Sequence, residues 1–163
     1  MYTLPSSQHS KDNFVVKIYS CPVPFPFTFA VHTYIVFEHG PTVVRYDVNP
    51  IPFVDVSSNL FGHIKKDVLP PEVGFRWLGK YPLNFGPRYK VKLYGKISGG
   101  PDSAAGKLYS FIASDGLKSY PFTHTYRMIL GPNSNTFIQW VLDQVPDSGL
   151  RLPSNAWGKD FKY

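Results

Sequence analysis

Proline and glycine interrupt this chain so often that a bundle of long helices is disfavoured. The 163 residues include 16 prolines and 13 glycines, and each of these residues ends or bends a helix. Aromatic residues make up 17% of the chain, with 13 Phe and 11 Tyr, which favours strands. A chain of this length fits one domain. We therefore predict an α+β fold in which an antiparallel sheet packs against two or three helices. Residues 13–163 are predicted to form a single globular domain, preceded by a flexible lead-in over residues 1–12.

Several classes of protein are excluded by composition. Hydrophobic residues at 43% against 17% charged residues exclude an intrinsically disordered chain. The single cysteine, Cys21, cannot form an internal disulfide or a multi-thiolate metal site. The N-terminus lacks the pattern of a secretory signal. The longest apolar stretch, Phe25–Phe37, is interrupted by proline and polar residues and falls short of the roughly 20 residues that a membrane helix needs. We therefore expect a soluble, cytoplasmic protein with no membrane span.

The net charge of +6 is concentrated in the second half of the chain, where residues 81–163 hold 10 basic and 5 acidic side chains. Much of this excess lies in residues 88–97, where basic residues alternate with tyrosine, valine and leucine. Such alternation is typical of a strand with one buried face and one lysine-rich face in water, and the lysines also discourage edge pairing. A nucleic-acid surface would use the same residues, but no binding motif supports one, so we do not expect nucleic acid to be a partner.

The clearest local unit is a β-hairpin. Its strands are Phe27–Glu38 and Thr42–Val48, and its turn is His39–Pro41. A first strand over Phe14–Tyr19 precedes it, and the proline-rich connector Cys21–Pro26 is predicted to lie outside any regular element.

The rest of the chain predicts short elements and two helices. Residues 49–87 are rich in proline and are expected to form loops with one or two short strands, and residues 54–57 stay undecided. Residues 103–115 and 134–145 carry apolar side chains at helical spacing, with Asp102 or Ser103 capping the first helix and Asn133 the second. The tail from residue 149 has no periodicity and is expected to lie extended on the surface or beside a groove.

His32 lies within the first hairpin strand, and its cross-strand neighbour depends on the turn. A two-residue turn at Gly40–Pro41 places Asn49 opposite His32, whereas a four-residue turn places Asp47 there. A three-residue turn would place Val48 opposite His32. Two of the three registers therefore supply a polar neighbour that can orient an imidazole, as a general base requires. A lone histidine in a strand is, however, more often a hydrogen-bonded core residue than a base.

Ser134 is predicted to lie in the first turn of the second helix. A helix N-terminus presents unpaired N–H groups and the positive end of the helix dipole, which stabilise an anion or a developing oxyanion. The simpler interpretation is that Asn133 caps the helix and Ser134 only occupies its first turn. The histidines have no recognisable ligand spacing, so we expect no metal and no cofactor.

Three segments resemble a bacterial family known only as a domain of unknown function. Its pattern has a GPNSNTF block and a closing LPxxAxGKD block, and these resemble Tyr126–Phe137, Val145–Pro153 and Gly158–Phe161. The earlier segments Ala30–Tyr34 and Arg45–Val48 resemble the first hairpin of that family. The similarity runs over most of the chain, from about residue 32 to residue 161.

A more distant resemblance implies a mechanism. In circularly permuted papain-like hydrolases of the NlpC/P60 and lecithin:retinol acyltransferase type, a histidine on an early strand precedes an NCxxF segment whose cysteine opens a helix. His32 and the segment Asn133–Phe137 are similar in order, with Ser134 at the cysteine position. A serine hydroxyl needs a general base during attack and a well-formed oxyanion hole, whereas a thiol is readily ionised beside an imidazolium.

This resemblance implies an amide or ester hydrolase or acyltransferase with Ser134 as nucleophile, His32 as base, and Asp47 or Asn49 orienting the base. The substrate would be a small molecule, a peptide or a lipid-like compound. The alternative is a catalytically inactive binding module that holds a peptide, a carboxylate or another anionic ligand in the same groove. A third hypothesis, binding to nucleic acid or an anionic surface through the basic strand, depends on the charge alone. The candidate ligand-binding residues are Asn133, Asn135, Thr136, Tyr34, Lys159 and Asp160.

Overall fold

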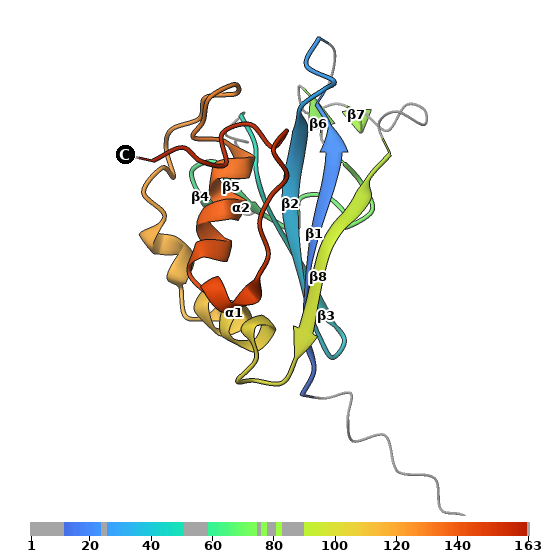
Figure 1. Cartoon of the computed structure of the whole chain (residues 1–163), viewed down its shortest axis with the longest axis vertical. Coiled ribbons are helices and arrows are strands. Elements are labelled where there is room, and N and C mark those ends of the chain that lie inside the picture. The colour runs from blue at the N-terminus through green and yellow to red at the C-terminus, as the bar shows by residue number, and fades with distance from the viewer. Residues whose placement is uncertain are drawn as a thin grey trace, which may run out of the picture.

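The computed structural model consists of two layers, a sheet and a pair of helices that cover one face of it (Figure 1). It describes residues 12–23, 26–50, 59–74, 76–77, 81–82 and 90–162. The predicted α+β class, with an antiparallel sheet against helices, is confirmed. The predicted lead-in over residues 1–12 lies almost wholly outside the described residues.

Six strands form the main sheet, and every neighbouring pair in it is antiparallel. Their spatial order is β4 (Asn59–Phe61), β5 (Ile64–Lys66), β3 (Thr42–Val48), β2 (Val31–His39), β1 (Phe14–Pro22) and β8 (Lys92–Gly99). A separate two-stranded ribbon pairs β6 (Arg76–Trp77) with β7 (Tyr81–Pro82). The described part of the region between residues 49 and 87 thus contains four short strands, more than the one or two predicted, while residues 54–57 lie outside it.

The central hairpin of β2 and β3 has the two-residue turn that was one of the three predicted alternatives. His39 pairs with Thr42, and the ladder continues to the pair of Ile35 and Tyr46. Gly40 occupies the turn with a φ of 55°, a backbone conformation that glycine adopts without steric cost.

The start of this hairpin was predicted wrongly. β2 begins at Val31, because residues 27–30 form a loop closed by a hydrogen bond from the Ala30 N–H to the Phe27 carbonyl (2.9 Å). Cys21 and Pro22 were assigned to an irregular connector, but both belong to β1, where Pro22 pairs with Val31 at the last position of the ladder. A proline at the end of a strand costs little pairing, since no further ladder bond depends on its missing N–H.

The basic strand also differs from its prediction. β8 spans Lys92–Gly99 instead of residues 88–97, and it is the outer strand beside β1. Its residues are exposed or half-buried throughout, so it has no deeply buried face. Lysines at an exposed edge discourage pairing with another chain, which was the predicted role of this charge.

Two α-helices, α1 (Ala104–Ala113) and α2 (Ser134–Asp143), lie on one face of the sheet, each about as predicted. The Ser103 hydroxyl caps α1 by accepting a hydrogen bond from the Gly106 N–H (3.2 Å). A side chain at Gly106 would meet the Pro101 carbonyl oxygen at 2.3 Å, which explains a glycine within a helix. Short 3-10 turns follow each helix, η3 (Gly116–Ser119) and η4 (Pro146–Ser148). Among the described residues, no helix has the length and apolar character needed to cross a membrane.

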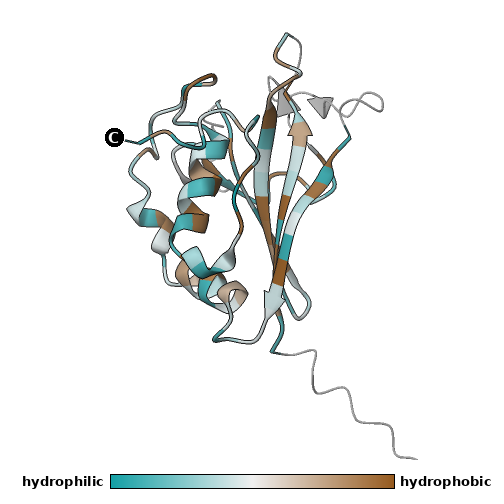
Figure 2. Ribbon diagram, in the orientation of Figure 1, coloured by the Kyte–Doolittle hydropathy of each residue, from teal (hydrophilic) through white to brown (hydrophobic). Residues whose placement is uncertain are grey.

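The hydrophobic core fills the space between the helices and the sheet, and hydrophobic residues alternate with polar ones along the strands (Figure 2). Alternation arises because successive side chains of a strand point to opposite faces. Four strands and both helices supply buried core side chains, among them Ile18, Ile35, Tyr46, Ile64, Leu108, Phe137 and Ile138, and the C-terminal segment adds Leu152 and Ala156. The C-terminal segment from residue 149 contains no helix or strand and runs beside α2, where the Leu152 N–H donates to Gln139 Oε1 (3.1 Å).

Leu108 and Leu93 offer a matched test of this core. Leu108 of α1 is completely buried, whereas Leu93 of β8 is 51% exposed. We expect Leu108→Ala to lower the free energy of unfolding by about 2–5 kcal/mol, because it removes buried contacts and leaves a cavity. Leu93→Ala should change it by less than about 0.5 kcal/mol. Urea unfolding measures both variants, and equal losses would contradict the assignment of α1 to the core.

Candidate functional site

The N-terminus of α2 is held by a reciprocal cap. Asn133 Oδ1 accepts hydrogen bonds from the backbone N–H groups of Asn135 (3.0 Å) and Thr136 (3.3 Å), and the Asn133 N–H donates to Thr136 Oγ1 (3.0 Å). Asn133 Nδ2 in turn donates to the carbonyls of Met128 and Trp157. The predicted cap is therefore confirmed, and the Asn133 amide is fully used in holding the start of α2.

Asn135 and Thr136 fasten the same turn to its surroundings. Asn135 Oδ1 accepts from the Thr33 hydroxyl (2.8 Å), and its Nδ2 donates to the carbonyls of Val31 (2.8 Å) and Trp157 (2.9 Å). Thr136 Oγ1 donates to the Gly158 carbonyl (2.6 Å). These side chains were candidates for ligand binding, and the structure gives them bonds that tie α2 to β2 and to the C-terminal segment.

Ser134 lies between these residues as the first residue of α2, and it is buried. Within the described part of the chain, no hydrogen bond uses the Ser134 hydroxyl or its backbone N–H. The N–H groups of a first helical turn have no partner within the helix and carry the positive end of its dipole. The hydroxyl therefore lies beside a group that can stabilise negative charge.

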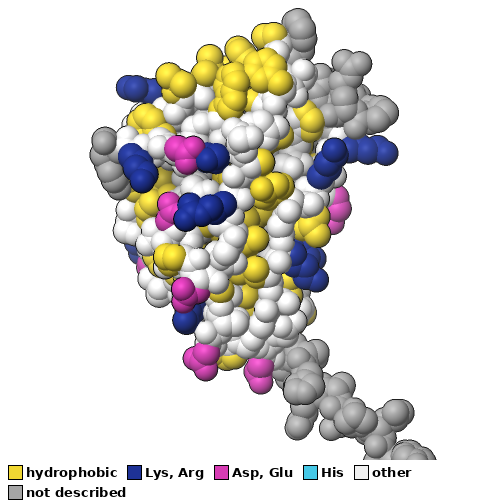
Figure 3. All heavy atoms as spheres, viewed as in Figure 1, with side chains coloured by type: hydrophobic (Ala, Val, Ile, Leu, Met, Phe, Trp, Pro, Cys, Tyr) yellow, Lys and Arg dark blue, Asp and Glu magenta, His cyan; other side chains and the backbone are white. Residues whose placement is uncertain are grey.

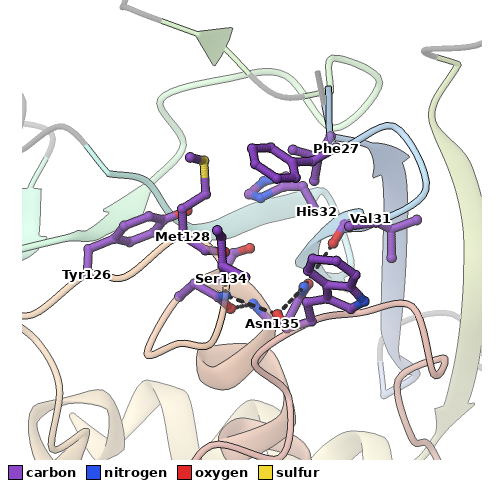
Figure 4. Close-up of a pocket in the computed structure, with 12 residues that line it drawn as sticks. Phe27, Val31, His32, Tyr126, Met128, Ser134 and Asn135 are labelled. Carbon is purple, nitrogen blue, oxygen red and sulfur yellow. Dashed lines mark hydrogen bonds between the residues drawn. The ribbon is translucent and has the colours of Figure 1, made fainter. Parts of the chain in front are cut away.

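Ser134 and His32 line the same pocket, although they come from α2 and β2, about a hundred residues apart (Figure 4). The cavity holds about 30 Å³, enough for one or two water molecules. Four polar residues at its base and side are Asn133, Ser134, Asn135 and His32. The remaining walls are mostly apolar: Val23, Phe27, Ala30, Val31, Tyr126, Met128, Ile129 and Trp157.

The imidazole of His32 contacts Asp47 of β3. His32 Nε2 lies 3.0 Å from Asp47 Oδ1, and both side chains are buried. Continuing the observed register of β2 and β3 places Asn49 opposite His32, as the two-residue turn predicted. The ring nevertheless reaches Asp47 diagonally, because residues two apart on one strand face share their cross-strand neighbours. Of the two candidates left open, Asp47 is therefore the one that the imidazole contacts, although Asn49 lies directly opposite.

Asp47 is also paired with Arg45, two residues earlier on the same face of β3. Arg45 Nη2 lies 2.7 Å from Asp47 Oδ2, and Asp47 Oδ1 accepts from the Val48 N–H at 2.8 Å. The Arg45 guanidinium lies 3.5 Å from the centre of the Tyr34 ring and donates through Nη1 to the carbonyls of Pro70 and Val73. A buried carboxylate needs such partners, because an isolated buried charge is very costly.

The charge of Asp47 is set by these neighbours. Burial by itself would raise the pKa of this carboxyl, but the charges and hydrogen bonds of His32 and Arg45 lower the pKa to about 2. Asp47 is therefore ionised over the physiological range and can hold the His32 N–H. Tyr126, which lines the pocket, has its pKa raised by burial and further by the Asp47 charge, so it remains a neutral phenol.

Other predicted site residues lie elsewhere. Asn49 is buried, and its backbone carbonyl accepts from His63 Nδ1 (2.9 Å). Tyr34 packs under Arg45 and donates its hydroxyl to the Pro71 carbonyl (2.6 Å). Lys159 and Asp160 pair with each other at the surface (2.6 Å) and do not line the pocket of Ser134.

Sequence reasoning missed three residues of this site: Arg45, Tyr126 and Trp157. Arg45 could have been found, since it shares a face of strand β3 with Asp47, two residues away. Tyr126 and Trp157 lie in segments without periodicity, and nothing in the sequence indicates that they meet at one pocket. Within the residues that the structure describes, no group of three or more His, Cys, Asp or Glu side chains is arranged to hold a metal ion.

Gly158 tests the role of the capped turn. Its φ is 88°, and a Cβ there would lie 2.5 Å from Asn133 Nδ2. We expect Gly158→Ala to destabilise the protein by about 1–3 kcal/mol in urea unfolding, because it strains the backbone and displaces the cap. Gly100→Ala is the control, since a Cβ at Gly100 meets nothing within 4 Å. Equal stability of the two variants would show that the close approach of Gly158 to Asn133 does not contribute to the stability of the fold.

The ionisation of Asp47 predicts a pH dependence of stability. The folded-state pKa of about 2 lies below the ordinary value of 3.8, so the carboxylate contributes stability that is complete above about pH 5. This contribution, about 2 kcal/mol, is lost as the pH falls through 4 toward 2. Asp47→Asn should lower stability at pH 7 and flatten the profile between pH 4 and 2.

The matched control is Asp160→Asn, because Asp160 is 81% exposed. Urea unfolding at a series of pH values compares the three proteins. An acid profile that is the same in Asp47→Asn and in wild type would show that Asp47 does not carry this charge effect.

Part of the chain matches a known protein family. A sequence model of the family described as "Protein of unknown function (DUF3750)" matches residues 73–161, a range that includes α1, α2 and the C-terminal segment but neither His32 nor Asp47. No curated protein and no solved structure matches the chain. The predicted resemblance to a domain family of unknown function is confirmed over residues 73–161, and the match does not extend to the first hairpin, where the resemblance was predicted to begin.

Proposed function

The chain belongs to the DUF3750 family of unknown function, and from the pocket at the start of α2 we propose that it is a serine-dependent hydrolase or acyltransferase acting on an amide or an ester. The single observation that carries the proposal is that Ser134 and His32 line one pocket while Asp47 contacts Nε2 of the His32 ring. A nucleophile, a base and an orienting carboxylate are the three groups that acyl transfer needs.

The proposed nucleophile is Ser134 Oγ. Its position at the first residue of α2 supports this role, because the Ser134 backbone N–H has no acceptor among the described residues and can donate to the oxyanion that forms when the hydroxyl attacks a carbonyl carbon. The bonds of Asn133, Asn135 and Thr136 hold this turn, so the Ser134 N–H is in place before the substrate binds.

The proposed base is Nδ1 of His32, because Nε2 is the ring nitrogen that lies at Asp47. An ionised Asp47 favours the imidazole tautomer that keeps its proton on Nε2, and this leaves Nδ1 free to accept a proton. As Ser134 Oγ bonds to the carbonyl carbon, its proton passes to Nδ1. When the tetrahedral intermediate collapses, the bond to the leaving amine or alcohol breaks and His32 returns the proton to that group.

The acyl-serine that remains is then attacked by water or by an acceptor alcohol or amine, with His32 again taking and returning the proton. The order of the groups, with a histidine strand ahead of the serine helix, supports a papain-like relationship of the circularly permuted kind. The apolar walls of the pocket favour a substrate with an uncharged group beside the scissile bond.

A fluorophosphonate probe tests the nucleophile. We expect the wild-type protein to gain the mass of one phosphonyl group, and peptide mapping to place it on Ser134. Ser134→Ala should not be labelled, and His32→Gln should be labelled about a hundredfold more slowly, because the base is lost. Intact-protein mass spectrometry follows the reaction.

Ser154→Ala is the matched control, since Ser154 is an exposed serine near Trp157 and should have no effect. If wild type and Ser134→Ala were labelled alike, or if neither were labelled, the hydrolase proposal would be wrong. In the second case the inactive binding module becomes the better account of the pocket.

A further inference from the structure

Large apolar side chains are exposed around the mouth of the Ser134 pocket. Leu130 is 77% exposed, Phe29 55% and Ile129 44%, and Met128 beside them is also exposed. Figure 3 shows hydrophobic side chains gathered at one end of the molecule. Soluble domains scatter such residues singly, and a contiguous group marks an interaction surface.

Two loops and the C-terminal segment build this surface, which we call the apolar rim: Phe27, Phe29, Met128, Ile129, Leu130 and Trp157. The rings of Phe29 and Trp157 pack with centres 4.9 Å apart, and Asn155 Nδ2 donates to the Phe29 carbonyl (3.2 Å). Phe27, Met128 and Ile129 line the Ser134 pocket, and Ile129, Leu130 and Trp157 line a second, more open hollow of about 530 Å³. The loop between β1 and β2 and the loop before α2 therefore meet at the same end (Figure 1).

The exposure of the rim is built into the fold. The Arg127 N–H donates to the Pro132 carbonyl (2.7 Å), and the Gly131 N–H donates to the Arg127 carbonyl (3.1 Å). These bonds close the loop and leave Met128, Ile129 and Leu130 on its outside. Exposing an apolar side chain such as Leu130 to water is unfavourable, and burying it against a partner surface would be favourable.

The charges beside the rim are mostly positive. Arg127 directly precedes the exposed loop residues, and Lys162 directly follows Phe161, which lines the open hollow; both side chains are exposed. The acid of the C-terminal segment, Asp160, is paired with Lys159. Apolar side chains flanked by cations match a membrane surface, where anionic headgroups surround an apolar interior.

We propose that the apolar rim docks the protein onto a bilayer that contains anionic lipid, with Leu130, Ile129 and Phe29 inserted among the headgroups and Arg127 at the lipid phosphates. Docking in this way turns the mouth of the Ser134 pocket toward the membrane. The proposal does not depend on catalysis, since a bilayer binds the rim whether or not Ser134 reacts.

Vesicle flotation tests this proposal. The full chain is mixed with vesicles of phosphatidylcholine alone or of phosphatidylcholine with phosphatidylglycerol. We expect binding to the anionic vesicles and weaker binding to the neutral ones. Leu130→Glu should lower the partition coefficient at least about tenfold, because it removes an inserted apolar group and adds a repelled charge. Near-ultraviolet circular dichroism checks that each variant is folded.

Leu93→Glu is the matched control, since Leu93 is 51% exposed but lies on β8, and it should bind as wild type does. Ser134→Ala should also bind normally, which separates this test from that of the hydrolase. The proposal would be overturned if wild type bound neither vesicle, or if Leu130→Glu bound as well as Leu93→Glu. It would also be overturned by self-association of wild type without lipid that Leu130→Glu abolishes, because the rim would then cover a second copy.

Discussion

The buried carboxylate of Asp47 is the charge around which the candidate site is organised. It lies in the middle of a sheet, where an unpaired anion would be prohibitively costly, and it is stabilised by Arg45 on one oxygen and by His32 and the Val48 N–H on the other. Arg45 also donates hydrogen bonds to the Pro70 and Val73 carbonyls, so the ion pair with Asp47 ties the segment after β5 to the hairpin. Removing either partner would leave Asp47 incompletely satisfied, so the hairpin, the segment after β5 and the imidazole are linked through one group.

A second set of bonds brings Ser134 to that imidazole. Three side chains flank the serine at the start of α2, those of Asn133, Asn135 and Thr136, and each of them forms a hydrogen bond outside its own turn. Asn135 joins the helix to β2 at Val31 and Thr33, immediately beside His32. The C-terminal segment closes the arrangement through the carbonyls of Trp157 and Gly158. Asn133, Asn135 and Thr136, three of the predicted ligand contacts, thus act mainly by positioning the serine.

The elements that depend on neighbouring residues in the sequence could be predicted from it. Asn133 as a cap and the two helices could be derived from residue types and spacing. The hairpin turn could be narrowed to three alternatives, of which the structure has the two-residue turn at Gly40–Pro41. The start of β2 could not be derived, because residues 27–30 alternate like a strand and only their loop hydrogen bonds show otherwise. The contact of His32 with Asp47 could not be derived from the register, because the imidazole reaches the diagonal neighbour and not the residue directly opposite. The positions of Tyr126 and Trp157 at the pocket could be seen only in the tertiary fold, since both residues come from segments without periodicity.

The central claim is that His32 acts as a base on the group at position 134. Its most direct test is the reactivity of Ser134→Cys with iodoacetamide as a function of pH, with and without the further change His32→Ala. An isolated thiol has a pKa of about 8.5, and an imidazole in contact lowers it. The account predicts alkylation well below pH 7 in Ser134→Cys and a profile shifted toward 8.5 when His32 is also replaced. Buried Cys21 is present in both proteins and cancels from the comparison. Two superimposable profiles would contradict the account.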